Sequence, residues 1–369
     1  MVKVCHVTSA HNSFDTRVFH KECVSLAAGG FEVYLVAPGE DREDHGVHVV
    51  GIGEKPAGTL NRIRSGFPGK AYQKALSLDC EIYHIHDPEL LPYALRLKKR
   101  GKTVIFDSHE FYSLLLEEKE YVPAALRKTA ARIYAAGETY ILRRLDAVIT
   151  PCTVDGENVF EGRARRIVFI DNLPLPEAIQ GIGTFSDGSE NTVGYLGSIS
   201  RSRGIGPLVK ACHAANAKLR LAGSVWPAYL EELKAMPEYS CVEYEGVLSI
   251  DQIPDFCRRI RVGMATLLPV GQYARVDNLP TKVYEYLGAG LPVIISNNRP
   301  GRKLAEEFDC CLCVDPENTE EMAAAIRTLL DDPEQARSMG ERGYNAVTER
   351  YSWAREAEKL LALYRELTV

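Results

Sequence analysis

Short apolar runs rich in β-branched residues alternate with helical patterns along most of the chain, and this alternation limits the fold more than any other feature. In the first half the runs are Val2–Val7, Glu32–Ala37, Val47–Ile52, Ile82–His86, Thr103–Phe106, Ala147–Thr150 and Ile167–Ile170. The helical patterns between them are Thr16–Ala28, Thr59–Leu78, Leu90–Lys99, Pro123–Leu145 and Val154–Phe160. Buried strands joined by helices form doubly wound parallel sheets. The first half therefore predicts one α/β domain of this kind.

The alternation breaks once and then resumes. Residues 181–191, GIGTFSDGSEN, have the glycine, serine and acidic composition of a linker or hinge. New strand patterns follow at Thr192–Leu196, Leu219–Ala222, Val242–Tyr244, Val262–Thr266, Pro292–Ser296 and Leu312–Val314, with long helical patterns from Thr319 onward. A chain of 369 residues also exceeds one typical core. We therefore expect two Rossmann-like domains with a cleft between them.

Composition and charge exclude several classes of function. A net charge of -6 gives a nucleic-acid partner no global electrostatic support. The first residues lack a signal-peptide core, and no apolar run approaches the roughly 18 residues of a membrane span, so we expect a cytoplasmic protein. The ten cysteines are scattered, apart from Cys310, Cys311 and Cys313, which cluster in the apolar run CCLCV. We expect buried, reduced thiols rather than disulfides or a zinc site, and a strand for the run CCLCV.

One helical pattern has a basic surface. Residues 123–145 carry Arg127, Lys128, Arg132, Arg143 and Arg144 with leucine, isoleucine and tyrosine interleaved. A solvated helix face is one interpretation. Peripheral contact with an anionic membrane, on its inner face, is the other.

The segment DNLPTKVYEYLGAGLPVI, residues 277–294, combines carboxylates, a lysine, a helix start and a buried strand. We expect Asn278 to cap a helix that runs from about Leu279 to Ala289, with Pro280 in its first turn. Lys282 and Glu285 are three residues apart and share one helix face. The helix N-terminus favours an anion such as a phosphate. The alternative is an ordinary capped helix with a surface ion pair.

Polar residues follow several strands of the first domain. His11 follows the first strand, His84 and His86 lie in IYHIHDPE, and His109 follows IFDS. We consider three interpretations: a polar floor of an active site, structural histidines, and a metal cluster, which lacks a compact ligand pattern. Asp15 is placed to cap the next helix. Arg17, in its first turn, is either part of a site, or a solvated surface residue or member of a local ion pair.

In the second domain, GYLGSISRSRGIGPL reads as strand, loop and helix. Gly197 and Gly204 permit a tight turn with close approach of the backbone. Arg201 and Arg203 add positive charge near the helix N-terminus, a combination that suits a diphosphate. A basic surface turn is the alternative. The loop lacks the dinucleotide-binding fingerprint, as does the first loop HNSFD.

Six segments occur in the order found in one known family. They are DTRVFHKECVSLAAGGFEV, YHIHDPELLP, IFDSHEFY, FIDNLP, YLGSISRSRGI and LPTKVYEYLGAGLPVI. The chain resembles the retaining glycosyltransferases of family 4, which have the GT-B fold of two Rossmann-like domains. The resemblance implies an acceptor domain at 1–175, completed by a returning helix at 352–369. It also implies a linker at 176–191 and a donor domain at 192–349.

The resemblance further implies a role for individual residues. It assigns the chemistry of transfer, without a metal or cofactor, to His109, Asp277, Arg203 and Lys282. It assigns the donor, a UDP- or GDP-linked sugar, to Glu285, which would bind the ribose, and to Gly197, Ser198, Arg201, Asn278, Leu279, Pro280 and Thr281. It places the acceptor, a glycan, lipid-linked or small molecule, near His11, Arg17 and His86. The chain departs from the family in several places. Asp277 replaces a glutamate, and Ser198 replaces an arginine whose charge Lys282 or Arg201 would supply. Arg203 stands where the family often has a phosphate-binding lysine, and HNSFD replaces a glycine-rich first loop.

Two rival functions remain at this point. The first is a sugar-nucleotide epimerase of the same architecture, which would act on the donor alone. The second is a binding protein with a degenerate site, because Asp277 and Ser198 depart from the family pattern.

Overall fold

The computed structural model describes residues 1–116, 123–175, 191–249 and 252–368. The chain forms two compact units, Met1–Asn172 with Ala354–Val369, and Leu173–Trp353. The expected linker at 176–191 lies, apart from Asn191, outside the described residues. Among the helices described, none combines the length and apolar content that crossing a membrane would require.

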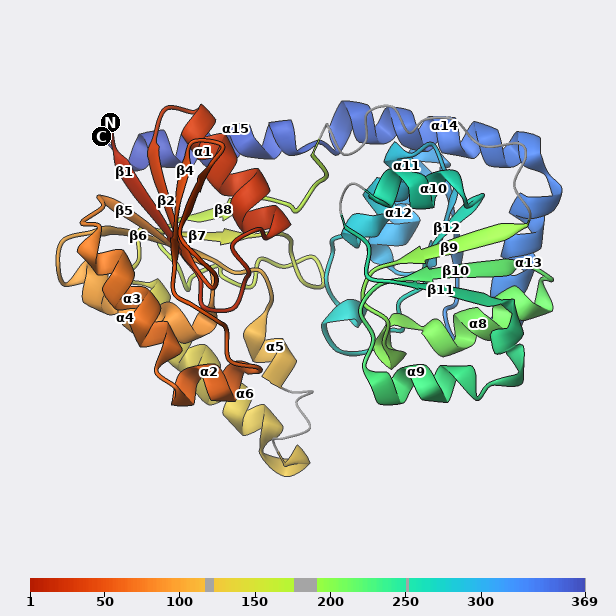
Figure 1. Ribbon diagram of the computed structural model, residues 1–369, viewed down its shortest axis with the longest axis horizontal. Helices are drawn as coiled ribbons and strands as arrows, with labels where there is room; N and C mark the ends of the chain where they lie inside the picture. The colour runs from red at the N-terminus through yellow and green to blue at the C-terminus, as the bar shows by residue number, and fades with distance from the viewer. Residues whose placement is uncertain (117–122, 176–190, 250–251, 369) are drawn as a thin grey trace. The chain divides into compact units, whose positions relative to one another are not determined.

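The first unit is built on an eight-stranded sheet in the order β3-β4-β2-β1-β5-β6-β7-β8 (Figure 1). The strands are β1 Lys3–Val7, β2 Glu32–Ala37, β3 Arg42–Asp44, β4 Val47–Gly51, β5 Ile82–Ile85, β6 Thr103–Asp107, β7 Ala147–Thr150 and β8 Ile167–Phe169. The seven expected strands are confirmed. The sheet is not wholly parallel, because β3 pairs antiparallel with β4. His45 and Gly46, both with positive φ, form the two-residue turn that reverses the chain there.

The helical segments of this unit are η1 Thr16–Cys23, a π-helix, α1 Val24–Ala28, α2 Thr59–Arg64, α3 Phe67–Ser77, η2 Pro88–Leu90, α4 Leu91–Lys98, α5 Tyr112–Leu116, α6 Ala124–Leu142 and α15 Trp353–Leu367. The single helix expected at 59–78 breaks at Gly66, which takes a left-handed conformation. The helix expected at 154–160 is wrong. Asp155 and Gly156 both have positive φ and form a tight turn between the bridged residues Val154 and Glu157.

The second unit has a six-stranded parallel sheet in the order β11-β10-β9-β12-β13-β14. Its strands are β9 Thr192–Leu196, β10 Lys218–Ala222, β11 Val242–Gly246, β12 Val262–Ala265, β13 Val293–Ser296 and β14 Cys311–Val314. Its helical segments are η3 Arg201–Arg203, α8 Ile205–Ala214, α9 Pro227–Lys234, η4 Pro237–Cys241, α10 Ile253–Arg258, η6 Gly271–Ala274, α11 Thr281–Gly288, α12 Arg299–Phe308, α13 Thr319–Asp331 and α14 Pro333–Arg350. All six expected strands are confirmed, including the cysteine-rich one.

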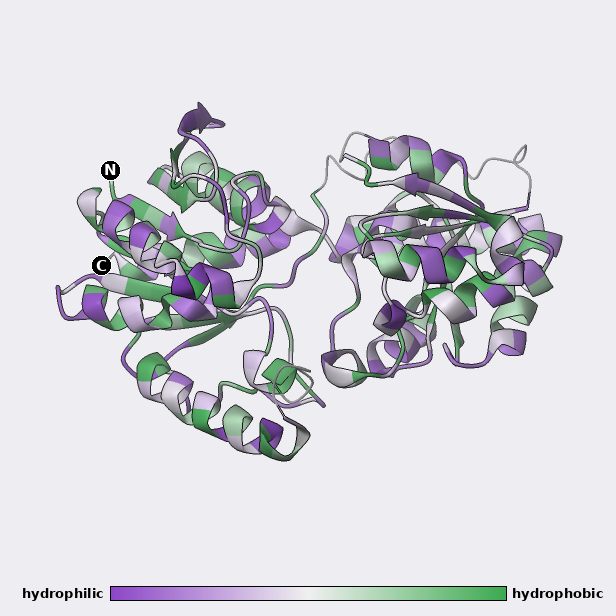
Figure 2. Ribbon diagram, turned by 60° about the horizontal axis from the view of Figure 1, so that its bottom comes forward, coloured by the Kyte–Doolittle hydropathy of each residue, from purple (hydrophilic) through white to green (hydrophobic). Residues whose placement is uncertain are grey.

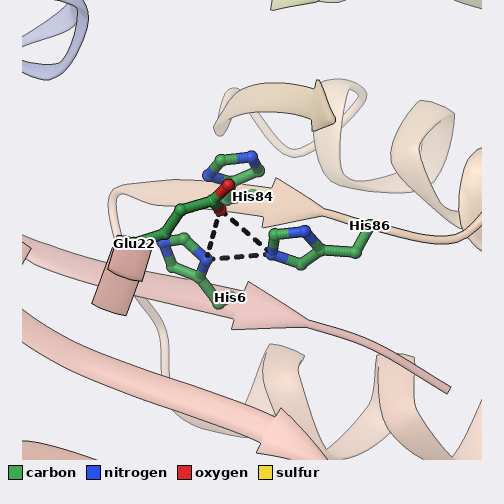
Figure 3. A group of neighbouring side chains, drawn as sticks. All are labelled: His6, Glu22, His84 and His86. Carbon is green, nitrogen blue, oxygen red and sulfur yellow. Dashed lines mark hydrogen bonds and ion pairs between the residues drawn. The ribbon is translucent and has the colours of Figure 1, made fainter. Parts of the chain in front are cut away.

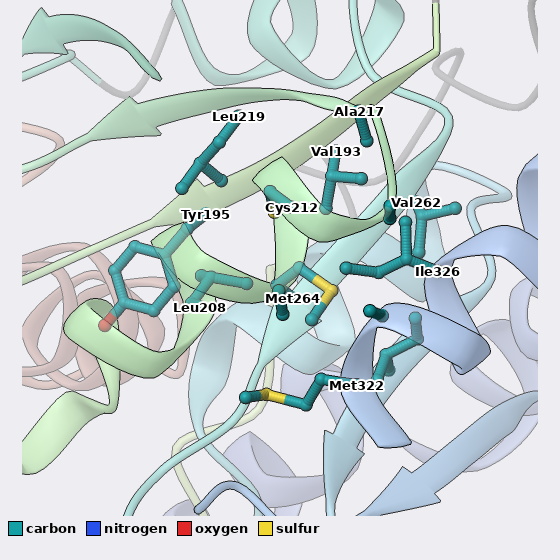
Figure 4. Close-up of a cluster of buried hydrophobic side chains, with 14 of the residues drawn as sticks. Val193, Tyr195, Leu208, Cys212, Ala217, Leu219, Val262, Met264, Met322 and Ile326 are labelled. Carbon is teal, nitrogen blue, oxygen red and sulfur yellow. The ribbon is translucent and has the colours of Figure 1, made fainter. Parts of the chain in front are cut away.

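Helices cover both faces of the second sheet, as the doubly wound prediction requires. Side chains of α8 and α13, among them Leu208 and Ile326, pack on one face against Val193 and Met264 (Figure 4). On the other face α10, α11 and α12 contribute a second buried cluster. Hydrophobic residues concentrate along the strands in both units (Figure 2). Burying this apolar surface stabilises the fold by about 25 cal/mol per Å².

Both sheets have a point where the strand order reverses. In the first unit it lies between β1 and β5, and in the second between β9 and β12. Loops leaving neighbouring strands in opposite directions open a crevice at such a point, where open α/β sheets bind ligands. The residues predicted from the sequence follow these strands.

Candidate functional site

A pocket of about 480 Å³ lies at the reversal point of the first unit. Its wall includes His11, Arg17, His86 and His109, which the sequence analysis selected from three separate segments. They meet because the loops after β1 and β5 and the segment after β6 converge on one edge of the sheet. The volume lies within the usual range for small-molecule sites. The fold thus brings all four residues to one pocket.

Arg17 is a buried residue of this pocket, and the interpretation of it as a surface residue is wrong. Its guanidinium donates through Nε and Nη2 to both oxygens of Asp107, at 3.0 to 3.1 Å, and through Nη1 and Nη2 to the carbonyl of Ile170. Burial alone would raise the pKa of Asp107, but Arg17 holds it well below its usual range. Arg17 and Asp107 therefore form a fixed ion pair beneath the pocket.

His11 lies at the mouth of the pocket, with 28% of its side chain exposed. Its Nδ1 lies 3.3 Å from Asp15 Oδ2, and its Nε2 lies 3.6 Å from Asp87 Oδ1. Burial opposes the charged form, but Asp15 and then Asp87 raise the pKa of His11 above its ordinary value. Asp15 also caps η1 by accepting from the backbone N–H groups of Arg17 and Val18, as expected.

Asp87 is a site residue that the sequence analysis missed. Its carboxylate accepts from the backbone N–H groups of Ser9 and Ala10 and from the Thr8 hydroxyl. It therefore holds the loop that follows β1 in place. The available signal was its position in the quoted HDPE segment, directly after a buried strand.

Histidines on β1, on β5 and directly after β5 form a buried polar layer under the pocket. His86 is 2% exposed, and its Nδ1 lies 3.0 Å from His109 Nε2. Its Nε2 lies 2.9 Å from Nδ1 of His6, a residue that the sequence analysis did not select. The expected polar floor therefore takes the form of neighbouring imidazoles, of which His109 is partly exposed to the pocket.

Some of these side chains are of the types that bind metals. Ligand atoms of His6, Glu22, His84 and His86 all lie within 4.8 Å of one another (Figure 3). Arg17 Nε, however, lies 3.0 Å from Glu22 Oε1. Burial, and then the charge of Asp107, raise the pKa of Glu22 well above its usual range. The neighbouring guanidinium and a carboxyl whose pKa is raised both disfavour a divalent ion at this position.

In the second unit, the turn after β9 depends on glycine. Gly197 has a φ of 122°, and a Cβ on Gly223 would lie 1.8 Å from the Gly197 carbonyl oxygen. The turns after β9 and β10 therefore pack with no side chain between them. A Cβ on Gly197 would itself lie 3.1 Å from Lys282 Nζ, so the lysine amine reaches this turn. The tight turn predicted at Gly197 and the predicted site residue Lys282 therefore lie next to each other.

Lys282 is 7% exposed, and its Nζ has no hydrogen-bond partner among the described residues. It lies 3.5 Å from the centre of the Tyr195 ring. Burial, and then the positive charge of Arg203, lower its pKa well below the ordinary value. An ammonium group buried without a hydrogen bond is costly, and an anion would satisfy it. The interpretation of Lys282 and Glu285 as a surface ion pair is therefore wrong.

The two arginines of the loop point to different neighbours. The Arg203 guanidinium lies over the Tyr273 ring at 4.5 Å, and its charge acts on Lys282. Arg201 is exposed, pairs with Glu232 of α9 and lies over the Tyr229 ring at 4.9 Å. Of the two, Arg203 is thus the one whose charge adds to that of Lys282. Ser198 is exposed, and its carbonyl accepts from the Tyr195 hydroxyl.

Helix α11 begins later than expected. Pro280, with ψ of 139°, is the N-cap, and the first helical residue is Thr281. The prediction of Asn278 as N-cap and Leu279 as first residue is wrong, because proline disfavours helical geometry in the residue before it. Leu279 is instead buried in the apolar cluster under the sheet. Asn278, Pro280 and Thr281 are partly exposed at the helix start.

The two carboxylates of this segment have different surroundings. Asp277 is 15% exposed at its side chain and lies 3.4 Å from Nη1 of Arg299, the first residue of α12. Arg299 was not selected from the sequence. Glu285 is half-buried on α11, and its charge acts on Lys282. The Asp277 side chain, although shorter than that of the family's glutamate, therefore forms an ion pair with Arg299.

Family models match both halves of the chain. The model described as Glycosyltransferase Family 4 matches residues 16–172, and the one described as Glycosyl transferase-like matches residues 203–362. The chain is 28% identical over 190 residues to alpha-maltose-1-phosphate synthase of Mycolicibacterium smegmatis, covering 48% of each protein. It is 29% identical over 126 residues to alpha-D-kanosaminyltransferase of Streptomyces kanamyceticus, covering 34% of this chain and 31% of that protein. The chain thus matches about half or less of these relatives' length.

Solved structures share the fold over the whole chain. Sucrose-phosphate synthase from Thermosynechococcus elongatus superposes with a TM-score of 0.77 at 18% identity, over 100% of this chain and 99% of that one. Anabaena HepE, solved in complex with UDP and glucose, gives 0.73 at 13% identity, over 99% of this chain and 100% of that one. At these identities the likeness concerns the fold.

Proposed function

We propose that the chain is a retaining, metal-independent glycosyltransferase of family 4, the family whose model matches residues 16–172, with the GT-B fold. It would move a sugar from a nucleotide-diphosphate sugar to an acceptor in glycan or glycoconjugate assembly. The observation that carries the proposal is the buried amine of Lys282, which has no hydrogen-bond partner among the described residues and lies against the Gly197 turn. A diphosphate is the anion that this position suits.

The donor would bind to the second unit. Lys282 and Arg203 would neutralise the diphosphate, and the N–H groups at the start of α11 would add donors. Glu285 would accept hydrogen bonds from the ribose hydroxyls, and Asp277 would contact the sugar. The complexes of Anabaena HepE with UDP and UDP-glucose support a uridine donor. A guanosine donor remains the alternative.

The acceptor would bind to the first unit, in the pocket that contains His11 and His109. Departure of the nucleoside diphosphate creates negative charge on its β-phosphate, and fixed cations lower the energy of that state. An oxocarbenium-like sugar needs positioned hydroxyl partners more than a strong nucleophile. We therefore assign no covalent nucleophile, and we give His109 the role of contacting the reacting sugar.

The proposal is tested in two steps. A thermal-shift screen against UDP- and GDP-sugars should show selective stabilisation by one donor, because a ligand that binds only the native state raises the Tm. That donor is then incubated with the protein, alone and with a panel of glycan and lipid-linked acceptors. Sugar transfer that needs the acceptor and retains the anomeric configuration is expected. A new nucleotide sugar formed from donor alone would indicate the epimerase instead, and binding without any turnover would indicate a binding protein.

We further propose that α6 contacts an anionic membrane. Leu126, Ile133 and Tyr140 are 56%, 69% and 56% exposed and recur every seven residues, so they lie along one face of the helix. Lys128, Arg132, Arg143 and Arg144 are exposed on the same helix or directly after it. Apolar side chains flanked by cations suit a surface of anionic lipids.

Replacing both Leu126 and Ile133 by glutamate is expected to reduce binding to phosphatidylglycerol vesicles at low salt by roughly tenfold or more, because charge and apolar area are both lost. Vesicle co-sedimentation measures the change. Val247→Glu, which alters an exposed apolar residue of the second unit that is 72% exposed, is the control. Wild-type protein that does not sediment with anionic vesicles would contradict this proposal.

A further inference from the structure

Imidazole nitrogens connect the pocket to the interior of the first unit. Nε2 of His109 lies 3.4 Å from Asp107 Oδ2 and 3.0 Å from Nδ1 of His86. Nε2 of His86 lies 2.9 Å from Nδ1 of His6. His86 thus contacts one imidazole with each of its nitrogens, whereas His109 uses only Nε2 and His6 uses only Nδ1 in these contacts.

The series continues through a tyrosine from the other end of the sequence. The hydroxyl of Tyr364, on α15, lies 3.1 Å from Nε2 of His6 and 2.7 Å from Nδ1 of His84. Nε2 of His84 makes no hydrogen bond among the described residues, and it lies 3.9 Å from Asp107 Oδ2, the oxygen that also faces His109. We call this series, Asp107, His109, His86, His6, Tyr364 and His84, the histidine circuit.

Burial disfavours a charge on the buried histidines and on the tyrosine of the circuit. His6, His84 and Tyr364 are fully buried, and His86 is 2% exposed. Burial lowers the pKa of His84 to about 3 and lowers those of His6 and His86 well below the ordinary value. A neutral imidazole has one donor and one acceptor nitrogen, and a hydroxyl has one proton. The position of one proton therefore determines the direction of every hydrogen bond in the circuit.

Asp107 determines that direction. Its carboxylate, ionised beside Arg17, can only accept, and it faces Nε2 of both His109 and His84. With protons on those nitrogens, the one proton on His109 Nε2 is shared between Asp107 Oδ2 at 3.4 Å and His86 Nδ1 at 3.0 Å, and His86 Nε2 donates to His6 Nδ1. His6 Nε2 then donates to the Tyr364 oxygen.

The last hydrogen bond of the circuit, from Tyr364 to His84, agrees with this direction. The Tyr364 hydroxyl proton goes to Nδ1 of His84, whose own proton on Nε2 faces Asp107. The opposite direction would put the lone pair of His109 Nε2 at 3.4 Å from a carboxylate oxygen. It would also put the lone pair of His84 Nε2 at 3.9 Å from the same carboxylate oxygen.

We propose that Asp107, together with the circuit in which Tyr364 joins His6 to His84, holds His109 as the tautomer protonated on Nε2, so that its Nδ1 is a hydrogen-bond acceptor for a sugar hydroxyl. Tyr364, His6 and His86 are then positioning residues for His109. The contact of Nδ1 with a sugar rests on the proposed function, whereas the tautomer itself rests on the contacts of the circuit alone.

The tautomers are measured by ¹⁵N NMR of protein labelled at histidine. At pH 8, His6, His84, His86 and His109 should each show an unprotonated Nδ1 and a protonated Nε2. Single histidine-to-glutamine variants assign the signals. Elemental analysis of the same sample reports any bound metal, which would make these nitrogens ligands instead of hydrogen-bond partners.

Tyr364→Phe removes one oxygen and opens the circuit. The signals of His6 and His84 should change to a mixture of tautomers, and kcat should fall by about threefold to tenfold with the donor KM unchanged. Tyr83→Phe is the matched control. The Tyr83 hydroxyl is also buried in this unit, but it bonds the backbone of Cys80 and Ala75 and touches no histidine of the circuit. This variant should leave the four histidines and kcat as in the wild type.

Three results would overturn the proposal: a wild-type His109 with its proton on Nδ1, a stoichiometric bound metal, or a Tyr364→Phe spectrum identical to that of Tyr83→Phe. The wild-type spectrum decides the first point even if a variant fails to fold. If the tautomers are as expected but no donor and acceptor pair gives transfer, the proposed function fails and the circuit stands.

Discussion

Glu285→Ala is expected to lower the affinity for UDP or GDP by roughly a hundredfold, because two hydrogen bonds to a charged acceptor contribute about 1.5 kcal/mol each. The residue is half-buried on α11, and alanine favours the helix at least as well as glutamate, so the fold should persist. Isothermal titration calorimetry measures the affinity. The loss should be similar for both nucleotides, since the ribose is common to them.

Glu306→Ala is the control for this substitution, because Glu306 is an exposed glutamate on α12 of the same unit. It should leave the affinity unchanged. Unaltered nucleotide binding by Glu285→Ala would show that the ribose is held elsewhere, and the assignment of the donor to α11 would have to be abandoned.

Lys282→Met is expected to have opposite effects on stability and on binding. Methionine fills the space without a charge that must be desolvated, so the Tm of the ligand-free protein should rise. Affinity for a nucleoside diphosphate should fall roughly tenfold to a hundredfold, because the buried cation for the phosphates is lost. Differential scanning calorimetry and titration calorimetry measure the two effects. Lys303→Met, at an exposed lysine of α12, should change neither.

The lowered pKa of Lys282 also makes the stability of the protein and its nucleotide binding depend on pH. Between that pKa and the ordinary value of 10.5, the unfolded chain binds the proton and the native protein does not. Wild-type stability therefore rises with pH in this interval, and Lys282→Met should remove that part of the slope. A bound diphosphate favours the ammonium form, so nucleotide binding should take up a proton. Titrations in buffers of different ionisation enthalpy measure this uptake, and its absence would contradict a Lys282–phosphate contact.

Strands were the most predictable part of the fold, because buried parallel strands are continuous apolar runs that the sequence shows directly. The errors occurred where one or two residues override a helical pattern. Asp155 and Gly156 turn the chain where a helix was expected, and Gly66 divides another helix. Pro280 delays the start of α11. These are local backbone effects that a periodicity averaged over several residues does not detect.

The candidate site was predictable in its residues and not in its contacts. Histidines at strand ends and the glycine and lysine segments were visible as motifs. The partners that give them their properties come from distant segments: Asp107 for Arg17, Arg299 for Asp277 and Tyr195 for Lys282. Only the topology of the sheets brings these segments together, so no spacing in the sequence reports them.

The return of α15 to the first unit has a consequence for the order in which the protein can fold. Gly29 packs against Leu361, and the Tyr364 hydroxyl completes the hydrogen bonds of two histidines in β1 and β5. The ribosome makes β1 and β5 early, but it makes α15 only after the whole second unit. The first unit thus begins to be synthesised first but can complete its fold only last. The hydrogen bonds of His6 and His84 to Tyr364 cannot form while residues 173–353 are being translated.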